Sequence, residues 1–219
     1  EEAIRMLKKE YDDGVRQIIV TPHYREGMFE TSQQKIVYVY QKLRREAVRM
    51  DPTLFLYLGC EFHTHSEMAD QLDQKMRPTL AGSRYVLTEF SSQHNYEWIR
   101  NQVYILRQRG YLPVLAHIER YPCLTGNMDN IRDIRDCGAY IQVNAGSVSG
   151  ENGWRIKHFC GQCMRQDLID FIATDAHGIR RRKPDLKACK KYVEKKMGSA
   201  YAEKIFNSNP EYILQNKVL

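Results

Sequence analysis

The residues of this sequence that could do chemistry are acidic and imidazole side chains, each close to the end of a short apolar run. They are His23, Glu61, Glu89, His117, Asp175 and His177. Imidazole and carboxylate groups together are typical ligands of catalytic divalent metal ions. Side chains at the carboxyl ends of neighbouring parallel strands converge on one site. If the apolar runs are such strands, the six side chains are predicted to form one metal centre.

The apolar runs have the character of buried parallel strands, because they are short, rich in β-branched and aromatic residues, and separated by segments of helical length. We expect strands at residues 17–21, 54–59, 85–88, 113–116, 140–144 and 168–174. Apolar residues at helical spacing predict helices between them, for example at residues 1–13 and from Thr31 or Ser32 to Asp51. No linker or repeat interrupts the alternation. The sequence predicts an α/β protein with one domain over residues 1–219, most simply a barrel.

The composition is that of an ordinary globular protein. The 219 residues are 42% hydrophobic and 27% charged. No apolar stretch approaches the roughly 20 residues of a membrane span, and no leader precedes a cleavage site. Six cysteines are too few for a disulfide scaffold, so we expect reduced thiols. Together these features predict a cytoplasmic protein without a membrane span.

The formal charge of +6 is modest, but cations lie beside the candidate ligands. Arg25 and Arg120 each follow one of the histidines by two or three residues, and Arg182 lies in the basic run 180–183. Cations at a metal centre suit an anionic substrate, phosphate above all. A solvated basic loop is the alternative explanation for the run. No basic stripe interleaved with aromatic residues is present, so we expect no nucleic-acid partner.

Two other motifs have competing explanations. His63 and His65 form a His-x-His pair, but they follow Glu61 in an expected loop, which favours a loop role over metal ligation. Cys160 and Cys163 form one C-x-x-C in an expected helix, without a second ligand pair. Core thiols are therefore favoured over a zinc site.

Two further positions are candidates for substrate contact. The segment 25–31 is predicted to be exposed and is chemically mixed, which suits the docking of a peptide near the metal centre. Asn144 ends a predicted strand, where its side chain either touches substrate or caps a turn. Both roles of Asn144 stay open at this point.

Four segments of the sequence carry a family resemblance. They are residues 21–30 (TPHYREGMFE), 78–80 (PTL) with 83–90 (SRYVLTEF), 113–121 (PVLAHIERY) and 173–177 (ATDAH). In combination they resemble the bacterial metal-dependent tyrosine phosphatases of the PHP (polymerase and histidinol phosphatase) superfamily. These are the CpsB/YwqE-type regulators of capsule and exopolysaccharide synthesis. The likeness extends from Gln17 to Pro210.

The resemblance implies a distorted (β/α)7 TIM-like barrel, the PHP fold, with two or three divalent metal ions, commonly manganese, at the strand ends. The residues that match the family's metal ligands are His23, Glu61, Glu89, His117, Asp175 and His177, with Glu61 as a bridging carboxylate. Arg120 and Arg182 match catalytic arginines that hold the substrate phosphate, and Arg25 is a further substrate-binding candidate. The implied partner is a tyrosine kinase, dephosphorylated on its phosphotyrosine tail, that controls polysaccharide synthesis. The oligomeric state stays open.

One part of the family pattern is missing from this chain. Family members begin with a strand that carries His-x-His, followed by an aspartate ligand, whereas this chain begins at Glu1 inside the helix that comes next. A barrel without that strand would leave two unpaired edges. We therefore expect the first strand and three further ligands to precede Glu1 in the natural protein.

The residue types support phosphate chemistry independently of the family name. Clustered metal ions lower the pKa of bound water and neutralise phosphate oxygens during an in-line displacement. The Cys-x5-Arg signature of cysteine-dependent phosphatases is absent. A phenol leaving group, with a pKa of ~10, departs with less protonic help than an alkoxide, so no general acid is assigned.

Two alternative functions stay open. A PHP small-molecule phosphatase of the histidinol-phosphate type would share the metals but enclose its substrate in a deeper pocket. The short loops predicted after Glu89 and His117 favour a shallow peptide site instead. A non-catalytic PHP binding domain is the second alternative, and it would follow if no His-x-His preceded Glu1.

Overall fold

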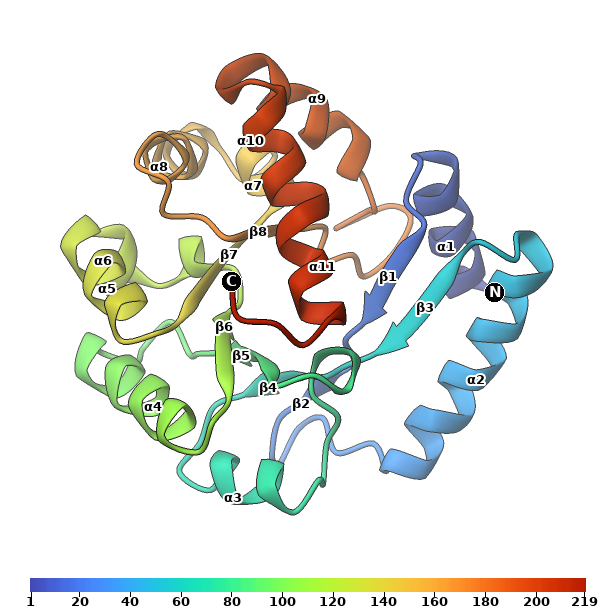
Figure 1. Ribbon diagram of the computed structural model, residues 1–219, viewed down its shortest axis with the longest axis horizontal. Coiled ribbons are helices and arrows are strands. Elements are labelled where there is room, and N and C mark those ends of the chain that lie inside the picture. The colour runs from blue at the N-terminus through green and yellow to red at the C-terminus, as the bar shows by residue number, and fades with distance from the viewer.

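The computed structural model describes residues 1–219, and its centre is a curled sheet of parallel strands (Figure 1). One ladder pairs β1 (Gln17–Val20) with β3 (Phe55–Leu58). The second has the order β2-β4-β5-β6-β7-β8. Its strands are β2 (His23–Tyr24), β4 (Glu61–His63), β5 (Tyr85–Glu89), β6 (Leu112–Leu115), β7 (Tyr140–Asn144) and β8 (Phe171–Ala173).

The two ladders continue into each other across a kink. The N–H of Gly59 donates to the carbonyl of Val20 at 2.9 Å, and the N–H of Glu61 donates to the carbonyl of Pro22 at 3.1 Å. A Cβ on Gly59 would lie only 3.0 Å from the side chain of Leu80, so a residue without a side chain suits this close approach. β1 with β2, and β3 with β4, therefore form two long strands. The sheet has the six strand positions that the sequence predicts.

Helices cover the outside of the curled sheet (Figure 1). The longer ones are α1 (Glu2–Asp12), α2 (Gln33–Met50), α4 (Tyr96–Gln108), α6 (Met128–Asp136), α8 (Trp154–Arg165) and α9 (Leu186–Met197). The shorter helical segments are α3 (Met68–Asp73), η1 (Leu80–Gly82), η2 (Ile118–Arg120), α5 (Pro122–Thr125), α7 (Ala145–Ser149), α10 (Ser199–Glu203), η3 (Lys204–Ser208) and α11 (Asn209–Leu214). None of them combines the length and the apolar character that a membrane crossing requires.

Local sequence explains where the long helices begin and end. The side chain of Ser32 accepts the N–H of Lys35 at the start of α2, and the side chain of Asn95 accepts the N–H of Trp98 at the start of α4. α1 is followed by Gly14, whose φ of 97° is a conformation that glycine adopts readily. The helices expected from apolar spacing at residues 1–13 and 32–51 are confirmed.

The last predicted strand is shorter than expected. Only residues 171–173 form β8, whereas Leu168 and Ile169 are buried outside it. The carboxylate of Asp170 accepts the N–H of Ile141 at 2.7 Å, so a side chain takes part in the pairing with β7 before the regular ladder begins. An apolar run in the sequence does not reveal that a side chain takes part in the pairing at this point.

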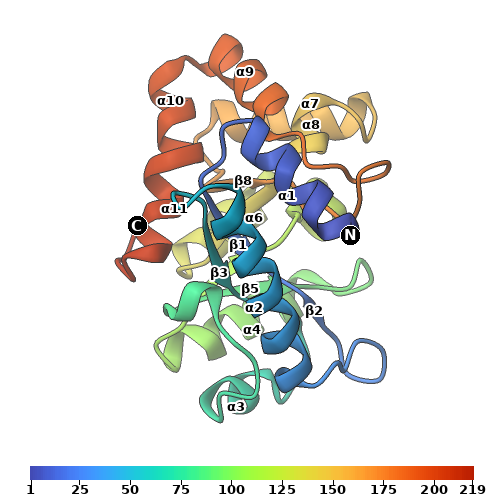
Figure 2. The same cartoon turned by 90° about the vertical axis from the view of Figure 1, so that its right-hand side faces the viewer.

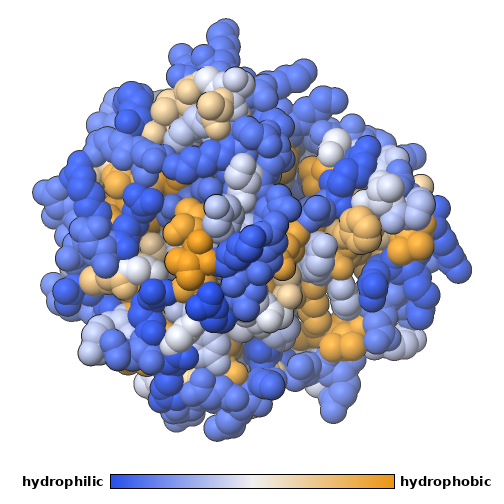
Figure 3. Space-filling model, in the orientation of Figure 1, coloured by the Kyte–Doolittle hydropathy of each residue, from blue (hydrophilic) through white to orange (hydrophobic).

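The main hydrophobic core lies between β6–β8 and the helices that cover them. It contains 25 buried residues, among them Ile99, Leu115 and Ile134, which are fully buried. Hydrophilic side chains dominate the face shown in Figure 3, and the apolar atoms seen there lie mainly in hollows between helices. Figure 2 shows that the segments 25–30 and 178–184, which follow strands, lie on the side away from the C-terminus. The strand ends thus open towards one face.

Candidate metal centre

Four of the predicted ligands meet where adjacent strands of the sheet are paired. They are His23 at the start of β2, Glu61 at the start of β4, Glu89 at the end of β5, and His117 just beyond β6. The Oε1 of Glu61 is 2.9 Å from the Nε2 of His117, and its Oε2 is 2.9 Å from the Nδ1 of His23. The Oε1 of Glu89 is 3.5 Å from the Nε2 of His117. Glu61 therefore lies between two imidazoles, with a second carboxylate alongside.

The charges of this cluster are coupled. Burial alone would lower the pKa of His117, which is 2% exposed, but hydrogen bonds to Glu61 and Glu89 raise it to about 9. Burial alone would raise the pKa of Glu61, but hydrogen bonds from His117 and His23 hold it well below its usual range. The hydrogen bond to Glu61 also raises the pKa of His23. The carboxylates are thus ionised and stabilise positive charge between them.

The donor atoms fit a divalent metal ion. One ligand atom each from His23, Glu61 and Glu89 lies within 4.8 Å of the others. Imidazole nitrogen and carboxylate oxygen suit zinc, iron and manganese, and carboxylates that already attract cationic histidines would also attract a metal cation. The residues present therefore match the chemistry of a metal centre.

Asp175 and His177 follow β8 and approach the cluster from its open side. The Nε2 of His177 is 2.9 Å from the Nε2 of His23. The carboxylate of Asp175 accepts hydrogen bonds from Arg120 at 2.9 Å and from Arg182. His177 is thus joined to the cluster through His23, whereas Asp175 is paired with the two predicted phosphate-binding arginines.

Three of these residues have left-handed backbone conformations. The φ angle is 36° at His117, 49° at Asp175 and 47° at Arg182. Non-glycine residues rarely adopt positive φ, and such strain gathers at functional sites, where the surrounding structure holds it. His117 and Asp175 each come two residues after a strand, so the turn redirects their side chains towards the site, and Arg182 lies further along the loop that follows β8.

Comparison with known proteins agrees with this geometry. Residues 1–215 match the family model described as "Capsular polysaccharide synthesis, CpsB/CapC". The chain belongs to this family. It is 33% identical to the tyrosine-protein phosphatase CpsB of Streptococcus pneumoniae over 224 residues, covering 100% of this chain and 92% of that protein. It is 27% identical to the tyrosine-protein phosphatase YwqE of Bacillus subtilis over 218 residues, covering 100% of this chain and 85% of that protein.

The fold also matches a solved member of the CpsB/CapC family. The TM-score is 0.91, with 27% identity over 99% of this chain and 87% of the other, to a structure from a study of B. subtilis YwqE and S. pneumoniae CpsB. That study describes those two proteins as unique metal-dependent tyrosine phosphatases. The α/β fold with a curled parallel sheet is therefore shared with that family.

Sequence reasoning missed Gln142, which this CpsB/CapC family member places behind the cluster. Its Oε1 accepts the N–H of His117 at 2.6 Å, and its Nε2 donates to the Oδ1 of Asn144 at 2.9 Å. The Nδ2 of Asn144 donates to Asp175 at 2.7 Å. These amides link His117 to Asp175, and Asn144 does not cap α7 through its side chain. The alternation of polar residues at positions 142 and 144 in an apolar strand is the signal that could have revealed the link.

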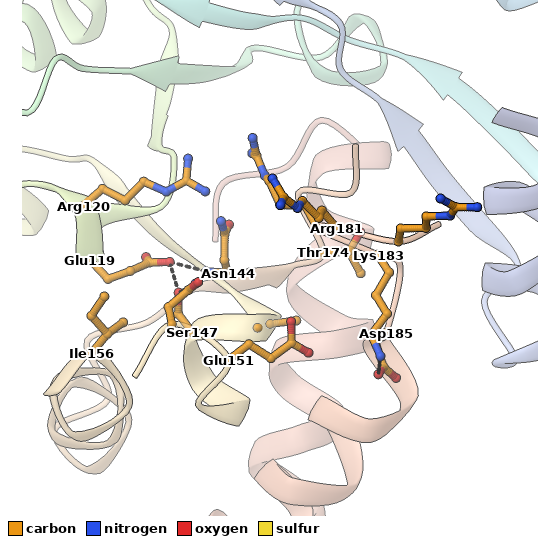
Figure 4. Close-up of a pocket in the computed structure, with 15 residues that line it drawn as sticks. Glu119, Arg120, Asn144, Ser147, Glu151, Ile156, Thr174, Arg181, Lys183 and Asp185 are labelled. Atoms are coloured by element: carbon orange, nitrogen blue, oxygen red, sulfur yellow. Dashed lines mark hydrogen bonds and ion pairs between the residues drawn. The ribbon is translucent and has the colours of Figure 1, made fainter. Parts of the chain in front are cut away.

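A polar cavity of about 520 Å³ opens beside this link (Figure 4). Arg120 projects towards it from one side, and the basic run 180–183 lines the other (Figure 4). The buried carboxylate of Glu119 accepts the N–H of Asn144 at 3.0 Å and the hydroxyl of Ser147 at 2.6 Å. The cavity is therefore open and partly cationic, with a fixed polar wall.

The remaining predicted residues lie outside the cluster. Arg25 is exposed on the turn after β2, and burial together with the charge of Arg25 lowers the pKa of His63. His63 is the last residue of β4, so its expected position in a loop is wrong, because the parallel pairing with β5 extends to it. Cys160 and Cys163 are buried free thiols in α8, as predicted, and burial raises the pKa of both.

Proposed function

We propose that this protein is a metal-dependent phosphomonoester hydrolase that removes phosphate from phosphotyrosine in proteins. The observation that carries the proposal is the convergence of two imidazoles and two carboxylates on one small volume, beside two arginines that meet at Asp175. The names of the similar proteins, which are called tyrosine-protein phosphatases, support the choice of substrate.

The ligand set under this proposal consists of the strand-end residues and the two residues after β8. It comprises His23, Glu61, Glu89, His117, Asp175 and His177. We assign two or three ions, with manganese as the metal. Divalent ions in such a centre lower the pKa of water and neutralise charge on the phosphate oxygens. Glu61, engaged through both of its oxygens, is the carboxylate best placed to be shared.

Arg120 and Arg182 act on the phosphate itself under this proposal. Both guanidinium groups now share the carboxylate of Asp175. A phosphate dianion offers more acceptor oxygens, in the fork geometry that guanidinium groups match. The arginines would hold those oxygens as negative charge develops, and the carboxylate of Asp175 would then be free to bind metal. Arg25, on the exposed turn after β2, is assigned to the protein part of the substrate.

The finer structural assignment follows the family. We propose that residues 1–219 form one phosphatase domain with the distorted (β/α)7 barrel of the PHP superfamily. The curled parallel sheet and the single face onto which its strands open support this assignment. The proposed partner is a tyrosine kinase of a capsular polysaccharide system, dephosphorylated on its phosphotyrosine-bearing tail. The match to a capsular polysaccharide synthesis family supports that role.

Hydrolysis of a phosphotyrosine peptide by the full-length protein tests the proposal. We expect activity with Mn²⁺, loss of activity with EDTA, and recovery when Mn²⁺ is added back. Treatment with iodoacetamide is the control, and it should leave the rate unchanged, because four of the six thiols are buried and none of the six belongs to the ligand cluster.

Two outcomes would replace the proposal. Hydrolysis of histidinol phosphate without hydrolysis of phosphotyrosine would support the small-molecule phosphatase. Metal binding without hydrolysis of either substrate would support a non-catalytic binding domain.

A further inference from the structure

The segment that follows His23 forms a closed, preformed turn. The backbone of Arg25 bonds twice to the backbone of Phe29, with N–H to carbonyl distances of 3.3 and 2.8 Å. The carboxylate of Glu30 accepts the N–H of Gly27 at 3.0 Å, and Gly27 has a φ of 72°. Because the bonds lie within the turn, its shape does not depend on a bound ligand.

The turn exposes two large apolar side chains beside the metal centre. Phe29 is 47% exposed and Met28 is 59% exposed. The ring of Phe29 stacks on the ring of His23, with centroids 5.5 Å apart and planes inclined by 29°. His23 in turn approaches Glu61 and His177 at 2.9 Å. An exposed aromatic ring therefore lies directly against His23, a member of the ligand cluster.

We propose that Phe29, supported by Met28, is a platform for the aromatic ring of an aryl phosphate whose phosphate group occupies the metal centre. The inference rests on the proposed phosphatase function and identifies what recognises the aryl group. Offset stacking of two aromatic rings is favourable beyond the burial of their area, whereas an alkyl chain offers no flat ring. Arg25 on the same turn adds a cation for the peptide beyond the ring.

The contact with His23 also has a structural explanation, because Phe29 could simply shield that imidazole. The two explanations differ in their consequences. A shielding role predicts that loss of the ring weakens metal binding and weakens every phosphate ligand equally. A platform role predicts that loss of the ring weakens aryl ligands alone.

Two phosphonates that cannot be hydrolysed separate these roles. Benzylphosphonate carries an aromatic ring and ethylphosphonate does not. Their dissociation constants are measured by calorimetry on the Mn²⁺-loaded, full-length protein. We expect Phe29→Ala to weaken the binding of benzylphosphonate about tenfold and that of ethylphosphonate less than about twofold. Phe29→Trp should keep the wild-type preference. Phe29→Leu, which keeps apolar volume without a flat ring, should behave like Phe29→Ala.

The matched control is Tyr104→Ala, which removes a side chain of similar size and exposure (59%) from α4. This change should alter neither dissociation constant. An unchanged ratio of the two constants in both Phe29→Ala and Phe29→Leu overturns the platform, and so does an equal loss for both phosphonates with lower metal content.

Failure of the platform and failure of the proposed function are distinguishable. A wild-type protein that hydrolyses phosphotyrosine while the Phe29 variants keep the wild-type ratio refutes the platform alone. A wild-type protein that hydrolyses no phosphotyrosine refutes the proposed function and, with it, the platform.

Discussion

Glu61 is the residue on which the cluster depends most, because each of its oxygens faces a different histidine at 2.9 Å. The change Glu61→Gln keeps the shape but removes the negative charge. We expect the variant to lose bound metal and turnover, since each lost charged ligand costs affinity steeply. Metal content by mass spectrometry of the purified, full-length protein measures the effect.

The control for that variant is the double change of His63 and His65 to Ala. Both imidazoles lie near Glu61 in sequence, yet neither belongs to the three-residue group with donor atoms close together. The double variant should keep its metal. Metal loss in the double variant, with Glu61→Gln unaffected, would mean that the wrong histidines were assigned.

The two arginines that share Asp175 are expected to affect rate and not metal content. Arg120→Ala or Arg182→Ala should lower kcat/KM on a phosphotyrosine peptide, because a charge-assisted contact is lost in the transition state. The loss of transition-state stabilisation should be about 2 to 4 kcal/mol. Lys at either position should restore activity only in part, because the fork geometry is lost. Arg44→Ala, an exposed position on α2, is the control. Wild-type kinetics in both Ala variants would exclude the phosphate role.

Asn144 and Gln142 are expected to act on the metal centre through other residues. Removing either amide breaks the link from His117 to Asp175. Asn144→Ala should weaken Mn²⁺ binding about 10- to 100-fold, as for other groups that orient metal ligands. The double variant with Gln142→Ala should lose little more, because both changes break the same chain. Titration with Mn²⁺ tests this, and additive losses would show that the two amides act separately.

At the scale of elements, α1 holds an unusual carboxyl group against the end of β8. One oxygen of Glu10 accepts the hydroxyl of Thr174 at 3.2 Å, and the other is buried without a partner. Burial raises the pKa of Glu10 to about 7. The folded state thus keeps the carboxyl proton of Glu10 at pH values where the unfolded chain, with the ordinary pKa of 4.5, has released it. The contribution of this proton to the stability of the folded state is complete below pH 4.5 and is lost as the pH rises through 7.

The change Glu10→Gln removes this dependence on pH. We expect the variant to be more stable than the wild type by about 3 kcal/mol at pH 9, with the difference vanishing near pH 4.5. Urea unfolding at the two pH values measures it. Glu194→Gln, an exposed carboxylate on α9, is the control and should show no such trend. A difference that is independent of pH would mean that Glu10 is not protonated in the folded protein.

Most of the elements could be predicted because their signals are local. Buried strands such as β6 read as short apolar runs, and α2 has a cap and a periodic face. The short helices α5, α7 and α10 could not be predicted, because one turn of helix carries too little periodicity. The close approach of Gly59 to Ile19 and Leu80, beside the break between β3 and β4, could not be predicted, because it is a contact between residues far apart in the sequence.

The candidate site, like the elements, combines features that local sequence predicts with features that depend on long-range contacts. The strand ends give the candidate ligands directly from the sequence. The left-handed φ at His117 could not be predicted, because non-glycine residues adopt such angles only when tertiary contacts hold them. Nor could the pairing of Asp175 with Arg120 and Arg182, which are 55 and 7 residues away along the chain.

At the scale of the whole molecule, the candidate ligands come from segments spread between His23 and His177. A metal ion bound by these residues would connect separate parts of the curled sheet. We expect Mn²⁺ at about 100 times its dissociation constant to stabilise the full-length protein by about 2.7 kcal/mol, which raises Tm by roughly 5 to 10 °C. Thermal unfolding with Mn²⁺ and with EDTA tests this, and Glu61→Gln should show no shift. Equal Tm values for the wild type in both conditions would exclude tight binding to the folded state.

Because the strands of the sheet are parallel, their amino ends and carboxyl ends lie on opposite faces of the molecule. The first and last residues of this chain lie near different faces (Figure 2). Asn216 accepts the N–H of Arg84 at 2.8 Å, and Arg84 directly precedes β5, so this contact lies at the amino end of that strand. Figure 2 shows the C-terminus on the side away from the loops that follow β2 and β8. Glu2, by contrast, accepts the N–H of Ile179 at 3.4 Å, within the loop that follows β8. A surface that binds the protein beside Asn216 would therefore leave the candidate metal centre open to solvent, whereas a surface that binds beside Glu2 would cover the loop after β8. The direction of the strands thus determines in which orientation an anchored molecule can meet a bulky substrate.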